Sequence, residues 1–321
     1  MKKAIKLKLA DLFAGIGGIR LGFESTNLVE TVFSSEIDKH ASTTYELNHL
    51  DKPSGDITTI KENDIPNIDI LAGGFPCQAF SVAGYRKGFS DTRGTLFFDI
   101  IRIIEAKMPK VVFLENVKGL VSHDNGKTFE IITKTLKDLG YSIFWKILNS
   151  CDFGNLPQNR ERIYIVCFRS DLNIEKFSFP HEIKRTVSLH SLLEKTKVAD
   201  KYYYRKESAI YDKLATTVTK KDSVYQYRRY YVRENKSGVC PTLTANMGTG
   251  GHNVPIILDD FGIRKLTPRE CLRIQGFPDT FKKPDMSDSQ IYKQAGNSVS
   301  LPVIQRIAEQ IVKALGKGTS A

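Results

Sequence analysis

The chain has 321 residues with 41% hydrophobic content, enough to bury the core of one large domain and a smaller one. Its formal net charge of +11 and its pI of about 9.3 indicate a nucleic acid partner, with a merely solvated basic surface as the alternative. The five cysteines are scattered and lack zinc spacing, which argues against a disulfide framework and a metal site. The sequence has no signal-peptide or membrane-spanning run, so we expect a cytoplasmic protein.

The first half of the chain alternates predicted strands and helices. A short strand over 5–9 precedes a glycine-rich turn over 11–18, and a helix carrying Ile19, Leu21 and Phe23 follows. The next predicted elements are strands over 29–34, 68–72, 111–114, 141–148 and 162–168, and helices over 96–106 and 127–139. This order predicts an α/β fold with a mostly parallel sheet that has helices on both faces.

Composition changes after about residue 173. Between residues 181 and 240, fourteen Lys and Arg residues stand against seven Asp and Glu residues, a balance of +7. Tyrosines are frequent there, periodicity is poor, and turn signals recur. We interpret residues 175–262 as a small, irregular, β-rich domain inserted into a larger domain formed by residues 1–174 and 263–321, which ends in a helix over 301–315.

The glycine-rich turn predicts a cofactor pocket. Gly15, Gly17 and Gly18 would let the backbone approach a ligand, although a purely structural turn explains the glycines equally well. Two acids strengthen the prediction: Glu36 ends the next strand, where it can accept both ribose hydroxyls, and Asp56 can accept from an adenine amino group. No phosphate-binding lysine follows the glycines, so S-adenosylmethionine fits better than a dinucleotide.

Two strand ends are predicted to carry reactive side chains. Cys77 lies in a turn after the strand over 68–72, and Glu115 follows the strand over 111–114. Taken alone, such a cysteine is more often a small buried hydrophobe, and such a glutamate an ordinary strand-end acid. Together, a thiol and a carboxylate at neighbouring strand ends can attack and protonate one flat heterocycle, which is the chemistry of methylation at carbon 5 of cytosine.

A pair of arginines follows further along the chain. Arg160 and Arg162 lie two residues apart in an extended segment and therefore point the same way, so both could face one anionic target. A surface ion-pair cluster is the alternative interpretation.

Six motifs occur in the order seen in DNA (cytosine-5)-methyltransferases, and the chain resembles this family in its bacterial restriction–modification type. The motifs are DLFAGIGG over 11–18, PCQ over 76–78, ENV over 115–117, QNRER over 158–162, REC over 269–271 and GNSV over 296–299. The resemblance covers nearly the whole chain. It implies a Rossmann-like, S-adenosylmethionine-dependent methyltransferase sheet, with residues 175–262 as a target-recognition domain inserted before the last elements.

The resemblance also implies roles for the reactive residues. Cys77 attacks carbon 6 of a cytosine flipped out of duplex DNA, and Glu115 protonates ring nitrogen 3. Carbon 5 then takes the methyl group of S-adenosylmethionine, which leaves S-adenosylhomocysteine. Arg162 touches the flipped base, and Arg160 positions Cys77 or contacts a phosphate.

Further residues match binding positions of the family. Those matching the cofactor pocket are Phe13, Ala14, Gly15, Gly17, Gly18, Glu36, Ile37, Asp56, Ile57, Pro76, Leu96, Asn297 and Val299. Those matching a loop that closes over DNA are Gln78, Ser81, Gly84 and Arg93. In the inserted domain, the DNA-binding candidates are Thr242 of a threonine–leucine element, Gly250 of a glycine-rich loop, and Arg228, Arg229 and Arg233. These arginines are candidates for guanine readout, and phosphate contact is at least as good an interpretation for each.

Three alternatives remain open. Transfer-RNA cytosine methyltransferases share these motifs, although a sizeable basic insert favours DNA. The second alternative is a catalytically dead DNA-binding relative, but such proteins usually lack the Pro-Cys or Glu-Asn-Val residues, which this chain has. The third is a dehydrogenase, which would need a hydride-transfer site, and no feature of the sequence indicates one. We expect a monomer that acts on double-stranded DNA beside a separate cognate restriction endonuclease, at a target sequence that one chain does not reveal.

Overall fold

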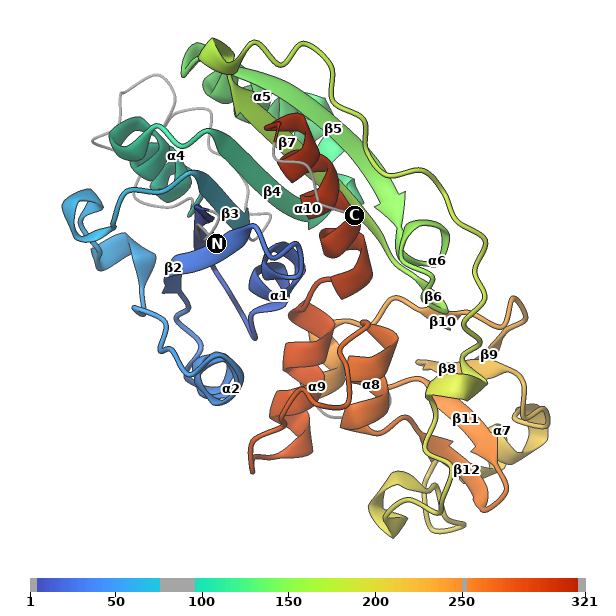
Figure 1. Cartoon of the computed structure of the whole chain (residues 1–321). Coiled ribbons are helices and arrows are strands. Elements are labelled where there is room, and N and C mark those ends of the chain that lie inside the picture. Colours follow the sequence, from blue (N-terminus) through green and yellow to red (C-terminus); the bar gives the residue numbers. More distant parts are fainter. Residues whose placement is uncertain (1–4, 76–95, 250–252, 317–321) are drawn as a thin grey trace. The chain divides into compact units, whose positions relative to one another are not determined.

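The computed structural model describes three stretches of the chain, residues 5–75, 96–249 and 253–316, and Figure 1 traces their path. Packing divides the chain into two units. The first comprises Met1–Leu148, Glu161–Pro180 and Ile304–Ala321, and the second comprises Asn149–Arg160 and His181–Val303. The target-recognition domain over 175–262 stays a prediction, because packing alone does not say what a segment recognises.

A six-stranded sheet in the order β2-β1-β3-β4-β7-β5 forms the centre of the first unit. Its strands are β1 (Leu7–Leu12), β2 (Val29–Ser35), β3 (Ile70–Gly74), β4 (Val111–Val117), β5 (Tyr141–Asn149) and β7 (Glu161–Arg169). The pairs β1–β2, β1–β3 and β3–β4 are parallel, and the pair β4–β7 is antiparallel. The carboxyl ends of β2, β1, β3 and β4 therefore meet at one edge of the sheet, where open α/β sheets bind ligands.

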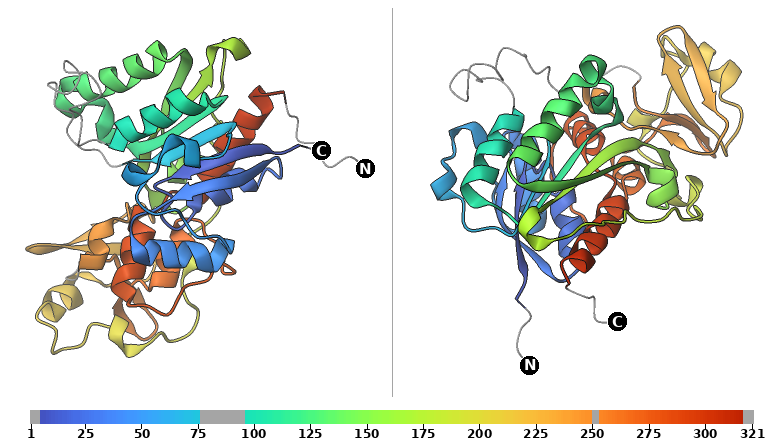
Figure 2. Two further views of the ribbon diagram at one scale, coloured as in Figure 1. Left: turned by 90° about the vertical axis from the view of Figure 1, so that its left-hand side faces the viewer. Right: turned by 90° about the horizontal axis from the view of Figure 1, so that it is seen from above.

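Helices lie on both faces of this sheet, as Figure 2 shows from two sides. They are α1 (Gly18–Glu24), α2 (Lys39–His49), α4 (Leu96–Lys107), α5 (Lys127–Asp138) and α10 (Leu301–Ala314). Successive strand side chains point to opposite faces. Leu114 of β4 therefore joins the core that contains Phe97 of α4 and Leu136 of α5, whereas Phe113 meets the ring of Phe23 in α1 at 5.3 Å between centroids.

The second unit contains a four-stranded antiparallel sheet in the order β12-β11-β8-β9. Its strands are β8 (Val224–Arg228), β9 (Tyr231–Asn235), β11 (Ile256–Asp259) and β12 (Gly262–Lys265). Leu214 of α7 (Tyr211–Thr217) packs with Tyr225 and Ile256 of this sheet in a small apolar core. The other elements are α6 (Ser150–Phe153), α8 (Pro268–Ile274), α9 (Asp288–Asn297) and the two-residue strands β6 (Gln158–Asn159) and β10 (Cys240–Pro241), which pair in parallel.

The predicted fold class is confirmed, since a mixed α/β sheet is accompanied by a separate antiparallel sheet. Two features were not predicted. The α2 helix buries only Ala41, Thr44 and Tyr45, which leaves a weak apolar period in the sequence. The β7 strand runs antiparallel to β4, a direction that an apolar run does not reveal. In the described ranges, no helix is long and apolar enough to cross a membrane.

Candidate functional site

A carboxylate holds the glycine-rich turn between β1 and α1. Gly15 and Gly17 have positive φ angles of 56° and 85°, which glycine adopts without strain. Glu36 follows β2 directly. Its Oε2 accepts from the backbone N–H of Gly15 at 2.7 Å, and its Oε1 accepts from that of Asp38 at 2.7 Å. The structure thus brings together the two parts of the predicted cofactor pocket, the glycines and the acid.

Gly17 is also a point of close packing. A Cβ atom at this position would lie 2.0 Å from Nε2 of His49 in α2, so a larger residue requires the histidine to move. Burial lowers the pKa of His49 to about 4, and its imidazole is therefore neutral at physiological pH. The turn packs directly on this uncharged ring.

Asp11, in β1 just before the turn, carries a fully buried carboxyl group. Within the described part of the chain, neither of its oxygens has a hydrogen-bond partner. Burial raises the pKa of Asp11 to about 8, and the nearby backbone N–H and the positive charge of Arg20 in α1 offset only part of this effect. The carboxyl group is therefore uncharged at neutral pH. The sequence pattern placed Asp11 only in a turn, although an acid within an apolar run is a signal of a buried carboxyl group.

The two units hold the other predicted cofactor residues that the structure describes. Asp56 caps the short 3₁₀ helix η1 (Ile57–Thr59), where its Oδ1 accepts a backbone N–H at 3.0 Å. Ile37 exposes 69% of its surface directly after Glu36, so an apolar surface and an acceptor lie next to each other in the chain. In the first unit, three of the remaining residues are buried: Ala14, Gly18 and Ile57. Phe13 there has a φ of 56°, and Leu96 begins α4. In the second unit, Asn297 at the end of α9 is exposed and Val299 is buried.

Glu115 lies where β3 and β4 end. It is the sheet partner of Gly74, and a Cβ atom on that glycine would lie 3.4 Å from Glu115 Oε2. Nε of Arg162 in β7 lies 3.2 Å from Glu115 Oε1, and the two side chains are only 14% and 12% exposed. Two of the predicted catalytic residues therefore form a largely buried ion pair at the strand ends.

Asn116 anchors the backbone just before Pro76. Its Nδ2 donates to the carbonyl of Phe75 at 2.8 Å, and its Oδ1 accepts from the N–H of Val117 at 2.8 Å. The motif over 115–117 includes Asn116 but predicted no role for it. A polar residue at the end of a buried strand is the signal of such a backbone contact. The predicted site residues that lie outside the described ranges are Pro76, Cys77, Gln78, Ser81, Gly84, Arg93 and Gly250.

Arg160 makes different contacts from Arg162. Its side chain is 2% exposed, and its guanidinium donates to the carbonyls of Leu243 at 2.8 Å, Gly296 at 3.3 Å and Ser298 at 2.5 Å. The two arginines therefore do not share one target. A buried guanidinium that is bonded to three carbonyls is not accessible to a phosphate, which argues against phosphate contact. The implied positioning of Cys77 stays a prediction, because Cys77 lies outside the described ranges.

The β8–β9 hairpin presents one polar and one apolar face. Tyr225 and Tyr227 of β8 join the small core of the second unit. Gln226 and Arg228 alternate with them and so point the other way, as does Arg233, which pairs with Gln226 across the hairpin. This solvent-facing side therefore carries two arginines and an amide.

A groove of about 1010 Å³ runs along this hairpin, and its walls also include Thr242 and Asn246. Arg229 in the tip has a positive φ of 38°, which is uncommon for a residue with a side chain, and the neighbouring Tyr230 is 76% exposed. Within the described ranges, Arg228, Arg229 and Arg233 form no ion pair. The groove thus offers uncompensated positive charge beside hydrogen-bonding groups.

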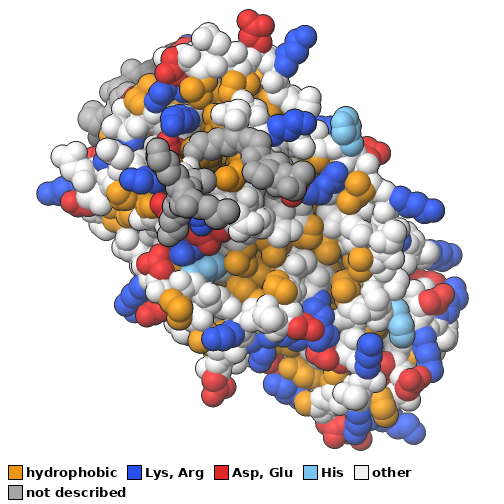
Figure 3. All heavy atoms as spheres, viewed as in Figure 1, with side chains coloured by type: hydrophobic (Ala, Val, Ile, Leu, Met, Phe, Trp, Pro, Cys, Tyr) orange, Lys and Arg blue, Asp and Glu red, His pale blue; other side chains and the backbone are white. Residues whose placement is uncertain are grey.

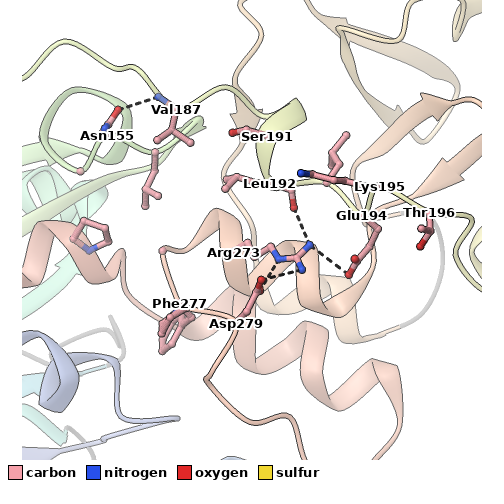
Figure 4. Close-up of a pocket in the computed structure, with 16 residues that line it drawn as sticks. Asn155, Val187, Ser191, Leu192, Glu194, Lys195, Thr196, Arg273, Phe277 and Asp279 are labelled. Carbon is pink, nitrogen blue, oxygen red and sulfur yellow. Dashed lines mark hydrogen bonds and ion pairs between the residues drawn. The ribbon is translucent and has the colours of Figure 1, made fainter.

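A second cavity in the same unit, of about 850 Å³, contains none of the predicted site residues (Figure 4). Arg273 on its wall is ion-paired with Asp279 at 2.7 Å and with Glu194 at 3.4 Å, so its charge is already compensated. Lys195 also lines this cavity, but Arg273, its one arginine, is paired, whereas the three arginines of the hairpin groove form no ion pair among the described residues.

Surface charge does not locate the site by itself. Lys and Arg side chains are interspersed with Asp and Glu over the face shown in Figure 3. Within the part of the chain that the structure describes, no group of three His, Cys, Asp or Glu residues could hold a metal ion. The candidate features are therefore the glycine turn and the strand-end ion pair in the first unit and, separately, the hairpin groove in the second.

Known proteins resemble this chain in sequence and in fold. A family model described as C-5 cytosine-specific DNA methylase matches residues 7–313. Type II methyltransferase M.Bsp6I of Bacillus sp. (strain RFL6) is 53% identical over 313 residues, covering 96% of this chain and 99% of its own. Type II methyltransferase M.HhaI of Haemophilus parahaemolyticus is 46% identical over 327 residues, covering 98% and 97%. The crystal structure of the Dnmt2 methyltransferase of S. pombe matches with a TM-score of 0.74 at 21% identity over 96% and 99% of the two chains, a likeness of fold alone.

Proposed function

Since this chain belongs to the C-5 cytosine-specific DNA methylase family, we propose that it transfers a methyl group from S-adenosylmethionine to carbon 5 of a cytosine within a short, specific duplex DNA sequence. The observation that carries the proposal is the Glu115–Arg162 ion pair at the strand end next to Gly74, three residues before Cys77. We further propose that the protein acts as a monomer and protects DNA from a separate restriction endonuclease, as the Type II names of its relatives suggest.

The residues around the glycine turn suit S-adenosylmethionine. The carboxylate of Glu36 has acceptor sites beyond the two backbone bonds it accepts, so ribose hydroxyls can also donate to it. The exposed side chain of Ile37 offers an apolar surface to the adenine ring, and Asp56 accepts from its amino group. When bound, the cofactor supplies an electrophilic methyl group. The other proposed cofactor residues are Phe13, Ala14, Gly15, Gly17, Gly18, Ile57, Pro76, Leu96, Asn297 and Val299.

The strand-end residues suit activation of a cytosine ring. The Cys77 thiolate bonds to carbon 6, and Glu115 holds a proton at ring nitrogen 3, so that carbon 5 becomes nucleophilic and accepts the methyl group. A positioned acid of this kind contributes about 10²–10⁴-fold to the rate. Loss of the carbon 5 proton to water or hydroxide and departure of the thiolate then restore the ring. Arg162 orients Glu115 and contacts the flipped base, and Arg160 positions the neighbouring backbone.

The hairpin groove of the second unit suits duplex DNA. Its three arginines, which form no ion pair among the described residues, can contact phosphates and guanine edges, both of which accept hydrogen bonds from guanidinium groups. The proposed DNA-binding residues are Arg228, Arg229, Arg233, Thr242 and Gly250 beside the groove, and Gln78, Ser81, Gly84 and Arg93 in the segment after Cys77.

Bisulfite sequencing of duplex DNA incubated with the protein and S-adenosylmethionine tests this function. We expect methylated cytosines at one position of a short recurring sequence. A parallel reaction with transfer RNA separates the two substrate classes. Methylation of transfer RNA without methylation of duplex DNA, or no methylation of either, contradicts the proposal.

A further inference from the structure

One arginine of the first unit bonds to the segment that follows Asp56. Arg102 lies in the middle of α4, and its side chain is 26% exposed. The segment over 57–64 consists of the 3₁₀ helix η1, a short connection, and the 3₁₀ helix η2 (Glu62–Asp64). Both belong to the first unit, and Arg102 lies in none of the motifs found in the sequence.

The guanidinium of Arg102 holds the backbone of η1. Its Nη2 donates to the carbonyl of Ile57, the first residue of η1, at 2.5 Å. Its Nη1 donates to the carbonyl of Ile60, the residue directly after η1, at 2.9 Å. A carbonyl at the end of a helix has no partner within the helix, and here Arg102 supplies one. One side chain thus bonds to the backbone at both ends of this short turn.

Two acidic side chains hold the guanidinium itself. Nε of Arg102 donates to Asp99 Oδ1, one turn earlier in α4, at 3.0 Å, and Nη1 donates to Glu62 Oε1 at 2.5 Å. The hydrogen bond from Arg102 lowers the pKa of Glu62 below its usual range, so this partner is charged at neutral pH. A guanidinium that is bonded to two carboxylates and two carbonyls has little freedom to turn.

Apolar packing joins the same two elements. Ile57 is buried and shares a core with Ile101 and Ile104 of α4. Burial of apolar surface is not directional, so it holds η1 against α4 without fixing how the turn is rotated. Hydrogen bonds depend on direction, and those from Arg102 therefore fix the rotation.

The side chain of Asp56 follows the orientation of η1. Asp56 caps this turn: its Oδ1 accepts from the N–H of Thr58 at 3.0 Å and from the Thr58 hydroxyl at 2.8 Å. A carboxylate can accept at about four sites, so the cap leaves room for a donor from a ligand. A change in the rotation of η1 would therefore change the direction of these sites.

We propose that Arg102 is a positioning residue for the adenine end of the cofactor site. The inference rests on the proposed function, in which Asp56 accepts from the adenine amino group. Arg102 fixes η1, and η1 fixes the carboxylate that recognises this amino group. Arg102 acts through Asp56, and it determines how strongly the protein prefers adenine to a base that lacks the amino group.

Isothermal titration calorimetry of the full chain with two ligands tests this inference. One is S-adenosylhomocysteine, and the other is its analogue in which hydrogen replaces the adenine amino group. We expect the wild type to prefer the first by at least about 10-fold, because the analogue loses a hydrogen bond to a charged acceptor.

Arg102→Met should remove most of this preference. We expect its affinity for S-adenosylhomocysteine to fall by about 10-fold and its affinity for the analogue to change by less than about 3-fold, so that the preference drops below about 3-fold. A general loss of structure would instead weaken both ligands alike. If Arg102→Met does not fold, Arg102→Lys replaces it, because one ammonium group cannot reproduce the forked contacts, and it should also reduce the preference.

Two further variants serve as controls. Arg169, the last residue of β7, bonds to both carboxylate oxygens of Asp171 at 2.7 and 2.9 Å and to the carbonyl of Met108, so Arg169→Met loses contacts of the same kind with other partners. We expect it to keep the wild-type preference. Asp56→Ala should lose the preference by itself, and adding Arg102→Met to it should reduce the preference no further.

Several results would overturn the inference. They are a wild type without the preference, an Arg102 variant or Asp56→Ala that keeps it, or an equal loss of preference in Arg169→Met. In each of these cases methylation of DNA by the wild type leaves the proposed methyl transfer intact. A wild type that binds no S-adenosylhomocysteine and methylates no DNA would refute the proposed function, and this inference with it.

Discussion

Glu115 depends on three strands for its position. The β4 strand carries it, Gly74 of β3 leaves room beside its carboxyl group, and Arg162 of β7 pairs with it. A carboxyl group that is mostly buried and ion-paired has little freedom to turn. Such a fixed orientation suits the proposed role of Glu115 at the ring nitrogen.

Glu115→Gln should slow methyl transfer with little change in DNA affinity. The amide keeps the shape but has no acidic proton to give, so we expect kcat to fall by about 10²-fold or more. Glu161→Gln is the matched control, since Glu161 forms an exposed ion pair with Lys118 and should change kcat by less than about 2-fold. Steady-state methylation at saturating DNA and S-adenosylmethionine measures kcat of both variants, and single-turnover methylation measures the chemical step alone. An unchanged rate in Glu115→Gln would assign ring protonation to another group.

Asp11 should make the stability of the fold depend on pH. Its pKa rises from an ordinary value of 3.8 to about 8 on burial, so the unfolded chain releases this proton first as pH rises. The stability that Asp11 contributes is therefore complete below about pH 4 and is lost as pH rises through 8, by at most about 1.4 kcal/mol per pH unit. Asp11→Asn should show a flatter free energy of unfolding between pH 5 and 8 in chemical denaturation. Equal slopes in the two proteins would mean that Asp11 is ionised in the folded state.

At the scale of elements, the glycine turn is inseparable from α2. Gly17 has a φ of 85°, and a Cβ atom there meets the imidazole of His49. The helix that sequence periodicity did not predict therefore forms one wall of the predicted cofactor turn.

Gly17→Ala should weaken binding of S-adenosylhomocysteine by roughly tenfold or more, because backbone strain of about 1–3 kcal/mol and the clash with His49 both distort the turn. Gly119→Ala is the matched control, since among the described residues beyond its own chain neighbours no heavy atom lies within 4 Å of a Cβ atom there. Isothermal titration calorimetry measures both affinities. Wild-type affinity in Gly17→Ala would show that the turn does not bind the cofactor.

Two arginines of the β8–β9 hairpin, Arg233 and Arg229, should contribute differently to DNA binding. Arg233 faces the groove beside Gln226, whereas Arg229 lies in the tip. We expect Arg233→Ala to change which duplexes are methylated. We expect Arg229→Ala to weaken binding to all duplexes alike and to reduce, by about 1, the magnitude of the slope of the logarithm of the binding constant against the logarithm of salt concentration. Lys221→Ala, at an exposed pair with Asp260, serves as the control. A uniform loss in both arginine variants would make Arg233 a phosphate contact.

For the whole molecule, the sequence predicted what local patterns encode. Apolar runs marked the strands, and the polar residues that follow them, such as Glu36 and Glu115, marked the strand ends. Contacts between distant residues were not predictable in this way. Arg160 bonds to Leu243 and Ser298, which lie 83 and 138 residues further along, and no local period records such a pairing. The pKa of Asp11 likewise follows from burial by the whole fold.

The central claim is that Cys77 adds to a DNA cytosine so that carbon 5 can be methylated. A duplex whose target cytosine carries fluorine at carbon 5 tests it most directly, because fluorine cannot leave as the proton does and the bond from Cys77 to carbon 6 then persists. With S-adenosylmethionine present, we predict a complex of the wild type that survives denaturation, and none for Cys77→Ala, which should still bind S-adenosylhomocysteine. No covalent complex on a duplex that the wild type methylates, or a covalent complex formed by Cys77→Ala, would contradict the claim.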